Sequence, residues 1–377
     1  MVSDVAPLPT RLVDSLIARR YYVLFVIAAA IWLDTGHAVH WQGHDWSYFL
    51  VGARALTGHV GLHVYARMPQ LQFGPPALLV PVVFRDVGPG HGWAVVSALG
   101  MLLGLVAIRL LEDTAAELVG RSRRLEICVL VGGAFFLAVW ASPAVSWGHP
   151  DDVLALLAIA AALRAVGLRR WLVGAALIGA AAAAKPWALL ALPLAMAGKG
   201  YRVRGFLLAI AVAIVTWVPF LIADHETRRV GDLHLRVEET STLHYLGLAV
   251  GAAPTWPRDA QLAVALVIGG LAVARGRWLL VPFVAFAVRI NLDPSVVYYY
   301  AAGPVLGAFV WDLVEPIRQL PVRTVATWFG LLAFPSAVLQ GGTGDTATHA
   351  MIAALRIAAL VVAVWVAVRA GPTRDVP

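Results

Sequence analysis

The sequence predicts an all-α, polytopic membrane protein with about twelve transmembrane helices. Of its 377 residues, 60% are hydrophobic and only 14% are charged, whereas a soluble domain carries about 25% charged residues. Apolar runs long enough to cross a bilayer recur along the whole chain. The basic residues fall mainly in alternate loops, as expected for a chain that crosses the membrane repeatedly.

The predicted spans begin just after the basic N-terminal segment. They are residues 21–34, 90–111, 126–146, 152–167, 171–184, 187–198, 205–223, 259–275, 278–290, 296–314, 322–340 and 348–369. The first apolar run lacks a small-residue cleavage site, so we predict a span and not a signal peptide. Several of these segments are shorter than a bilayer requires and must break or extend into their flanks.

The distribution of basic residues predicts the orientation. With residues 1–20 placed in the cytoplasm, 19 of the 29 basic residues lie inside, nine lie outside and one, Arg356, lies within a span. All 11 histidines then fall on the outer side. Both termini are then predicted to be cytoplasmic, and the polar loops are predicted on the opposite, outer face of the membrane.

The outer face carries the polar segments of a single domain, residues 1–377. They are the first outer loop (34–89), a short corner (147–152) and a second long loop (224–258). Ser47–Leu56 predicts an amphipathic helix in the membrane interface, and Pro75–Phe84 is apolar but too short to span. Residues 243–253 form a third candidate interfacial segment.

Asp45 is the first candidate for chemistry. It precedes the predicted interfacial helix, where a partly desolvated carboxylate is suited to accept a proton from an alcohol. An aspartate at that position also serves as an ordinary helix N-cap. Its neighbour His44 is a candidate for contact with a sugar.

The corner that contains His149, Asp151 and Asp152 is the second candidate. Pro150 ends one helix, and the two acids open the next, where capping and the helix dipole alone favour them. Adjacent acids on an outer rim also suit a metal ion or the hydroxyl groups of a sugar.

Basic residues on the outer side form a third set. Lys185 follows an apolar run and is the only lysine predicted outside, so it is either a snorkelling anchor or a ligand for a lipid phosphate. Arg228, Arg229 and Arg236 lie in the second long loop, close to His234 and His244. They make either a solvated loop or a phosphate-binding rim.

Two further features involve the C-terminal half. Arg289 and Asp293 flank a short outer turn before Tyr298–Tyr300, which fits an aromatic belt or, through Tyr300, stacking on a sugar. Arg356 lies inside the last span and requires a buried partner.

Several functional classes lack support. The sequence has no Walker motif, HExxH, GxSxG or Cys/His zinc spacing, and Asp151-Asp152 does not have the spacing of a DxD motif. We therefore predict neither a nucleotide, nor a metal, nor any other cofactor. No basic soluble domain exists to bind nucleic acid.

Together these motifs resemble the GT-C class of membrane glycosyltransferases, most closely the actinobacterial polyprenol-phosphate-mannose-dependent mannosyltransferases of the phosphatidylinositol mannoside type (glycosyltransferase family 87). The resemblance covers roughly residues 20–200 and later rests on the Asp293-Pro294 turn. It is carried by Asp45-Trp46-Ser47-Tyr48, Ala55-Leu56-Thr57-Gly58, Tyr65, Phe73-Gly74-Pro75-Pro76, Trp147-Gly148-His149-Pro150-Asp151-Asp152 and Lys185-Pro186. One departure is His149, because family members commonly have Gly-Gln where this chain has Gly148-His149.

The resemblance implies a location in a bacterial inner (plasma) membrane, with the outer face periplasmic, and a specific reaction. A sugar, by default mannose, passes with inversion from a polyprenyl phosphate to a hydroxyl of a lipid or glycan, with Asp45 as the general base. Lys185 or Arg228, Arg229 and Arg236 would hold the donor phosphate. His44, His149, Asp151, Asp152, His244 and Tyr300 would contact the acceptor or the sugar.

Two other functional classes make different predictions for the sequence. A lipid or sugar transporter or flippase predicts inverted repeats and polar residues in the middle of spans, whereas the polar residues here gather at one rim. A membrane acyltransferase requires a buried histidine with an Asn or Asp partner. The histidines of this chain all lie at or near the outer face.

Overall fold

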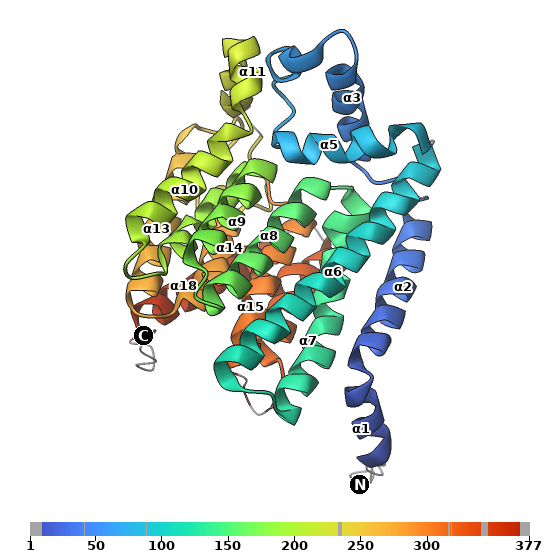
Figure 1. The fold of residues 1–377 in the computed structure, drawn as a ribbon, viewed down its shortest axis with the longest axis vertical. Helices are drawn as coiled ribbons and strands as arrows, with labels where there is room; N and C mark the ends of the chain where they lie inside the picture. The colour runs from blue at the N-terminus through green and yellow to red at the C-terminus, as the bar shows by residue number, and fades with distance from the viewer. Residues whose placement is uncertain are drawn as a thin grey trace.

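A computed structural model describes residues 10–40, 42–87, 89–232, 236–315, 317, 319–340 and 346–369. Within these ranges the chain is helical, with two isolated β-bridges and no strand (Figure 1). The elements are α1 Thr10–Ala18, α2 Arg20–Ala38, α3 Trp46–Thr57, η1 Gly61–His63, α4 Val64–Arg67, α5 Pro75–Phe84, η2 Arg85–Val87, α6 Pro89–Val119, α7 Arg123–Ala141, η3 Ser142–Trp147, α8 Pro150–Gly167, α9 Trp171–Ala184, η4 Pro186–Met196, α10 Arg202–Val215, α11 Val218–Ala223, η5 His225–Asp232, α12 Thr242–Tyr245, α13 Trp256–Ala274, η6 Trp278–Leu280, α14 Val281–Leu292, η7 Tyr298–Ala301, α15 Ala302–Val314, α16 Val322–Trp328, η8 Phe329–Ala333, α17 Phe334–Gln340 and α18 Thr346–Val368.

Six helices in the described ranges are long and apolar enough to cross a membrane. They are Arg20–Ala38, Gly92–Val119, Arg123–Trp147, Trp256–Ala274, Val322–Leu339 and Thr346–Val368. The prediction of an all-helical membrane protein is therefore confirmed in its coarse form. Helices are the expected solution, because a backbone in hydrocarbon has no water to bind and must satisfy its own polar groups.

The remaining predicted spans coincide with shorter or irregular helices. Trp171–Ala184 and Pro186–Met196 have 14 and 11 residues, and the second is a continuous 3₁₀ helix that contains Pro193. Proline disfavours a regular α-helix here, since it removes a backbone donor and clashes with the preceding turn.

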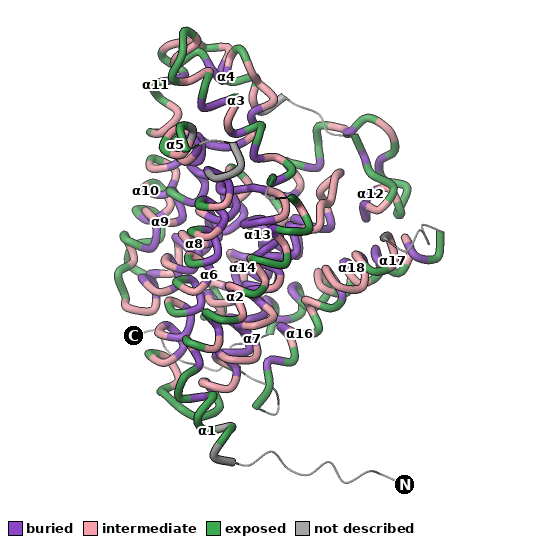
Figure 2. Tube along the Cα trace, turned by 90° about the vertical axis from the view of Figure 1, so that its right-hand side faces the viewer, coloured by how far each residue is buried: buried purple, intermediate pink, exposed green. Residues whose placement is uncertain are grey.

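The long helices pack into one bundle (Figures 1 and 2). Its main core lies between α6, α7, α8, α9 and α15 and contains Trp140, Phe136 and Phe309 at 0% exposure. Trp140 donates its indole N–H to the carbonyl of Gly100 at 2.8 Å. A Cβ atom at Gly104 would lie 2.8 Å from the Trp140 ring, so small residues let these helices approach closely, as is common in membrane bundles.

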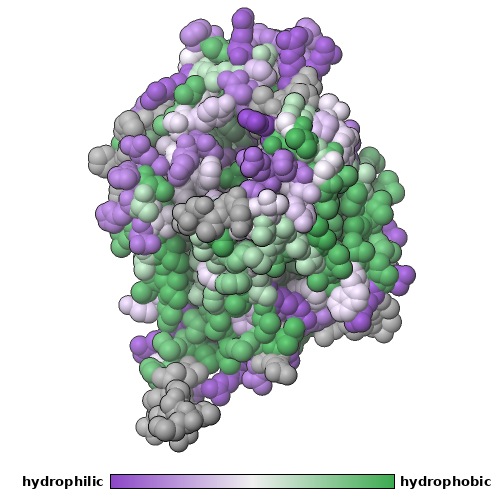
Figure 3. All heavy atoms as spheres, turned by 180° about the vertical axis from the view of Figure 1, so that it is seen from behind, coloured by the Kyte–Doolittle hydropathy of each residue, from purple (hydrophilic) through white to green (hydrophobic). Residues whose placement is uncertain are grey.

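The first outer loop meets the end of the predicted span 205–223 and the start of the second long loop at one end of the bundle. α3, α4 and α5 form one side, and α11 and η5 form the other (Figure 1). Tyr65 packs against Trp217 and Phe220 with ring centroids 4.8 and 4.9 Å apart, and His63 Nδ1 lies 3.2 Å from Asp224 Oδ2. Polar residues gather at this end, above a broad hydrophobic band (Figure 3).

The predicted interfacial segments are found as follows. α3 covers the predicted Ser47–Leu56, and α5 has the predicted bounds, Pro75–Phe84. The third segment, 243–253, contains only the end of the four-residue helix α12, followed by turns at Gly247 and Gly251, which both have positive φ.

Candidate functional site

The site begins where the first outer loop lies against the corner after α7. That helix loosens into the π-helical turn η3, and Gly148 adopts the left-handed region (φ 77°) before Pro150 starts α8. The backbone N–H of Asp45 donates to the carbonyl of Trp147 at 2.7 Å. A Cβ atom at Gly43 would lie 2.9 Å from the Cα of Gly148. The two glycines therefore permit the approach that brings Asp45 beside His149.

His149 bridges two carboxylates. Its Nε2 lies 2.8 Å from Asp45 Oδ2, and its Nδ1 lies 3.1 Å from Asp151 Oδ1. The ring stacks on Tyr299 with centroids 4.3 Å apart and meets the edge of Phe49 at 5.8 Å. Burial disfavours the charged imidazolium, but the carboxylates of Asp151 and Asp45 outweigh it and raise the pKa of His149 to about 9.

Lys185 neutralises the acids of the corner. α9 ends at Ala184, and the carbonyl of Ala184 accepts the backbone N–H of Gly74 at 2.8 Å. From this break the Lys185 ammonium donates to Asp151 Oδ2 and lies 3.5 Å from Asp152 Oδ2. Its side chain is 12% exposed, so the lysine acts here as a buried partner of the two acids.

Asp152 extends the cluster to the C-terminal half. The indole N–H of Trp187 donates to Asp152 Oδ1 at 2.8 Å, and Arg289 Nη1 lies 3.7 Å from the same oxygen. Arg289 also lies 4.0 Å from Asp293 Oδ2, and its guanidinium sits 3.7 Å above the ring centre of Tyr300.

The result is a chain of alternating charges that connects four outer segments. The order is Asp45, His149, Asp151, Lys185, Asp152, Arg289 and Asp293. The Asp45 side chain is 44% exposed, whereas those of Asp151 and Asp152 are 0% and 4% exposed. Oδ1 of Asp45 has no partner among the described residues, so it is available to a ligand.

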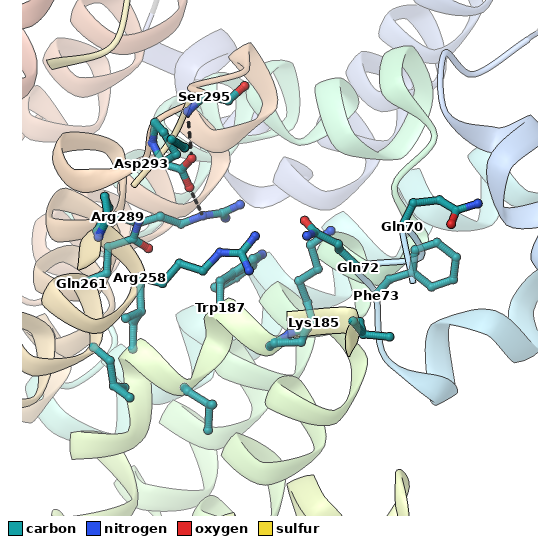
Figure 4. Close-up of a pocket in the computed structure, with 18 of the residues that line it drawn as sticks. Gln70, Gln72, Phe73, Lys185, Trp187, Arg258, Gln261, Arg289, Asp293 and Ser295 are labelled. Atoms are coloured by element: carbon teal, nitrogen blue, oxygen red, sulfur yellow. Dashed lines mark hydrogen bonds and ion pairs between the residues drawn. The ribbon is translucent and has the colours of Figure 1, made fainter. Parts of the chain in front are cut away.

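A cavity of about 1250 Å³ opens beside this cluster. Gln70 and Gln72 lie on one side of it, and Arg258 and Arg289 on the other, with Lys185 and Trp187 between them (Figure 4). Asp45 and Arg228 also line this cavity. Its apolar wall is formed by Leu189, Leu190, Trp217, Leu221 and Leu262. A phosphate with a long hydrocarbon tail matches this combination of cations and apolar surface.

The structure shows whether each of the three acids caps a helix. Asp45 occupies the N-cap position of α3, but its side chain makes no capping hydrogen bond and instead contacts His149. Asp151 and Asp152 do lie in the first turn of α8, as the helix dipole favours. Their side chains nonetheless bind His149, Lys185 and Trp187.

The other predicted residues divide into two groups. His149, Lys185, Arg228 and Tyr300 line the cavity with Asp45. The rest do not: His44 bonds Ser146 and packs on Trp147, Arg229 pairs with Glu226, Arg236 is exposed beside Ala252, and His244 lies in α12. His234 falls outside the described residues.

The tertiary structure shows the surroundings of two further residues, Arg258 and Arg356. Arg258, in the first turn of α13, faces the cavity although nothing in its local sequence distinguishes it from a loop arginine. Arg356, predicted to need a buried partner, donates to the backbone carbonyl of Thr240, and its own carbonyl accepts from Asn291 Nδ2 at 2.8 Å. Arg356 therefore holds the second long loop against α14 and α18.

The corner also meets the distance criterion for a metal site. One ligand atom each from His149, Asp151 and Asp152 lies within 4.8 Å of the others. Both ring nitrogens of His149 already face carboxylates, however, and Lys185 and Arg289 supply positive charge to the same acids. A divalent cation would have to displace or repel these partners, so the donor set does not fit one.

Comparison with known proteins adds no identification: no protein-family model, no curated protein and no solved structure matches this chain.

Proposed function

We propose that the chain is a GT-C-like membrane glycosyltransferase. It moves a sugar, by default mannose, from a polyprenyl phosphate to a hydroxyl group of a lipid or glycan acceptor, with inversion. The observation that carries the proposal is the position of Asp45, whose partly exposed carboxylate lines the same cavity as Lys185, Arg228, Arg258 and Arg289. A base and several cations on one cavity suit proton removal from an alcohol and departure of a phosphate.

The apolar wall supports a lipid-linked donor. Leu189, Leu190 and Leu262 line the same cavity as the cations, so a hydrocarbon tail that enters from the bilayer finds an environment as apolar as the one it leaves. Holding the tail in this way concentrates the sugar near Asp45, so that the transfer becomes effectively unimolecular.

The chemical step is a single displacement at the anomeric carbon. The acceptor oxygen forms a bond to the anomeric carbon while its proton passes to Oδ1 of Asp45. The bond between the anomeric carbon and the phosphate oxygen breaks, and the electron pair leaves with the phosphate. Positive charge from Arg258 and Arg228 stabilises the departing anion.

The proposal includes the topology. Six shorter helical segments, with α8, α9, η4, α10, α14 and α15 as the candidates, would complete about twelve crossings. The N-terminal end of the bundle lies away from α3, α5 and α11 (Figure 1). We place the cavity at the periplasmic surface of a bacterial inner membrane and both termini in the cytoplasm.

Asp45→Asn tests the assignment. Asparagine retains an oxygen that accepts from His149 but does not take up a proton, so transfer should fall at least about 100-fold. The measurement is radiolabelled mannose transferred from polyprenyl-phosphate mannose to a membrane lipid extract by protein in nanodiscs. Asp34→Asn, an exposed acid at the outer end of α2, is the matched control and should keep wild-type turnover.

Two results would contradict the proposal. Near-wild-type turnover of Asp45→Asn would remove the general base. Label that crosses the bilayer of wild-type proteoliposomes without becoming covalently attached to an acceptor would favour the transporter or flippase instead.

A further inference from the structure

We infer that His149 is a positioning residue that acts as a doubly protonated bridge, holding the carboxylate of Asp45 with its free oxygen toward the cavity. The inference rests on the proposed function and deepens it. It assigns a role to the residue at which this chain departs from the family that it resembles.

The hydrogen-bond geometry requires both ring nitrogens to donate. Nε2 faces an oxygen of Asp45 at 2.8 Å, and Nδ1 faces an oxygen of Asp151 at 3.1 Å. Ionised carboxylates only accept, and a neutral imidazole carries a single N–H. While both carboxylates are ionised, only the imidazolium satisfies both contacts, since either neutral tautomer would place a lone pair against a carboxylate oxygen.

The surroundings fix the orientation of the ring. Tyr299 stacks on one face, and Phe49 presents its ring at 90° to the imidazole. Asp151 cannot rotate away, because Lys185 holds its other oxygen and the side chain is fully buried. Asp45, in contrast, is 44% exposed, and its Oδ2 is held by His149 as its one side-chain partner among the described residues. Asp151 therefore fixes His149, and His149 in turn positions the exposed carboxylate of Asp45.

The charged groups around the ring set its titration. Asp45 faces it from the start of α3, Asp151 and Asp152 from α8, and Lys185 from the end of α9, while Tyr299 covers it from η7. The acids favour the imidazolium and Lys185 opposes it. Above a pH of about 9 the ring loses a proton, one contact is lost and Asp45 becomes free to rotate.

Two substitutions separate positioning from simple packing. His149→Gln retains an amide that donates to Asp45 but carries no charge, whereas His149→Ala removes both contacts. We expect His149→Ala to lower kcat about 100-fold with little change in KM, because the lost contact orients the base and does not bind substrate. His149→Gln should recover at least a tenth of wild-type kcat and lack the fall in kcat above pH 9 that we expect for wild type. His59→Gln, on the exposed first outer loop, is the control and should keep the wild-type profile.

A spectroscopic measurement keeps the inference independent of turnover. In protein labelled with ¹⁵N-histidine, the resonances absent from His149→Gln belong to His149. They should report an imidazolium at pH 7.5 that titrates near 9, with a lower midpoint in Asp45→Asn.

The outcomes distinguish this inference from the proposed function. A neutral His149 imidazole at pH 7.5 would contradict the inferred bridge even if wild type transfers sugar. The same holds if His149→Gln shows the same fall in kcat above pH 9 as wild type. An imidazolium that responds to Asp45→Asn supports the bridge, and the absence of transfer by the same wild-type preparation would then overturn the glycosyltransferase proposal alone.

Discussion

Among the described residues, two buried clusters of charged side chains lie near opposite ends of the bundle, and they differ in what surrounds them. In the cluster at the N-terminal end, Glu112 is 0% exposed and Arg20 is 9% exposed. Arg20 lies 2.6 Å from Glu112 and 3.2 Å from Glu126, and the Tyr21 hydroxyl donates to Glu112. None of these side chains lines the large cavity.

The cluster at the other end is equally well paired but lies open on one side. Asp151 and Asp152 are as deeply buried as Glu112, yet Asp45, Lys185 and Arg289 all line the cavity. Burial and ion pairing alone therefore do not indicate function, because both clusters have them. The access of an acid and several cations to one shared space is what distinguishes the outer cluster.

The largest expected effect comes from removing the central cation of the outer cluster. Lys185→Met leaves Asp151 and Asp152 with excess negative charge beside the cavity, which should destabilise the fold by about 3–5 kcal/mol. It should also lower turnover per folded molecule about 100-fold by repelling a phosphate. Detergent-based thermal unfolding and single-turnover transfer, both normalised to monodisperse protein, measure the two effects.

Glu112→Gln should show only the first of these effects. The change removes the main partner of Arg20 and should lower the free energy of unfolding by about 3 kcal/mol. Turnover per folded molecule should match wild type, since Glu112 does not reach the cavity. The comparison between the clusters fails if this variant loses transfer activity to the same degree as Lys185→Met.

The smallest expected effect concerns the far end of the outer cluster at low pH. Burial raises the pKa of Asp293 to about 6, although Arg289 opposes the rise. Asp293 is thus ionised at pH 7 and becomes neutral as the pH falls through about 6. Arg289 then loses a partner, and kcat/KM should fall a few-fold below that pH.

Asp293→Asn tests whether Asp293 causes this fall in kcat/KM at low pH. Its turnover should resemble that of acidified wild type at every pH, with no further loss between pH 7 and pH 5. If the variant shows the same fall in kcat/KM at low pH as wild type, a group other than Asp293 causes that fall.

The sequence was sufficient for features that depend on local patterns. α3 and α5 were predicted from amphipathic and apolar runs, and Asp45, His149 and Lys185 from their positions at the ends of apolar segments. The 3₁₀ geometry of η4 was not predicted, because an apolar run with Pro186 and Pro193 fits a short span equally well by composition.

Contacts between distant segments lay beyond the sequence. Asp45 and His149 meet although they are 104 positions apart in the sequence, and no periodicity relates their loops. Arg258 was missed for the same reason, since its role arises only where α13 lies opposite the first outer loop. Arg356 was recognised as anomalous, but its partner is a backbone carbonyl, which hydropathy and charge patterns do not reveal.

The order of the charges along the chain has a consequence for biogenesis. Lys185 follows Asp151 by 34 residues, and Arg289 belongs to a much later helix. During synthesis, Asp151 and Asp152 therefore leave the ribosome with only His149 as an earlier partner and before Lys185 and Arg289, and incompletely neutralised carboxylates are costly in hydrocarbon. The start of α8 should remain in water at the translocon until α9 and the break at Lys185 have been inserted. Assembly of this half of the protein therefore waits until Lys185 has been translated.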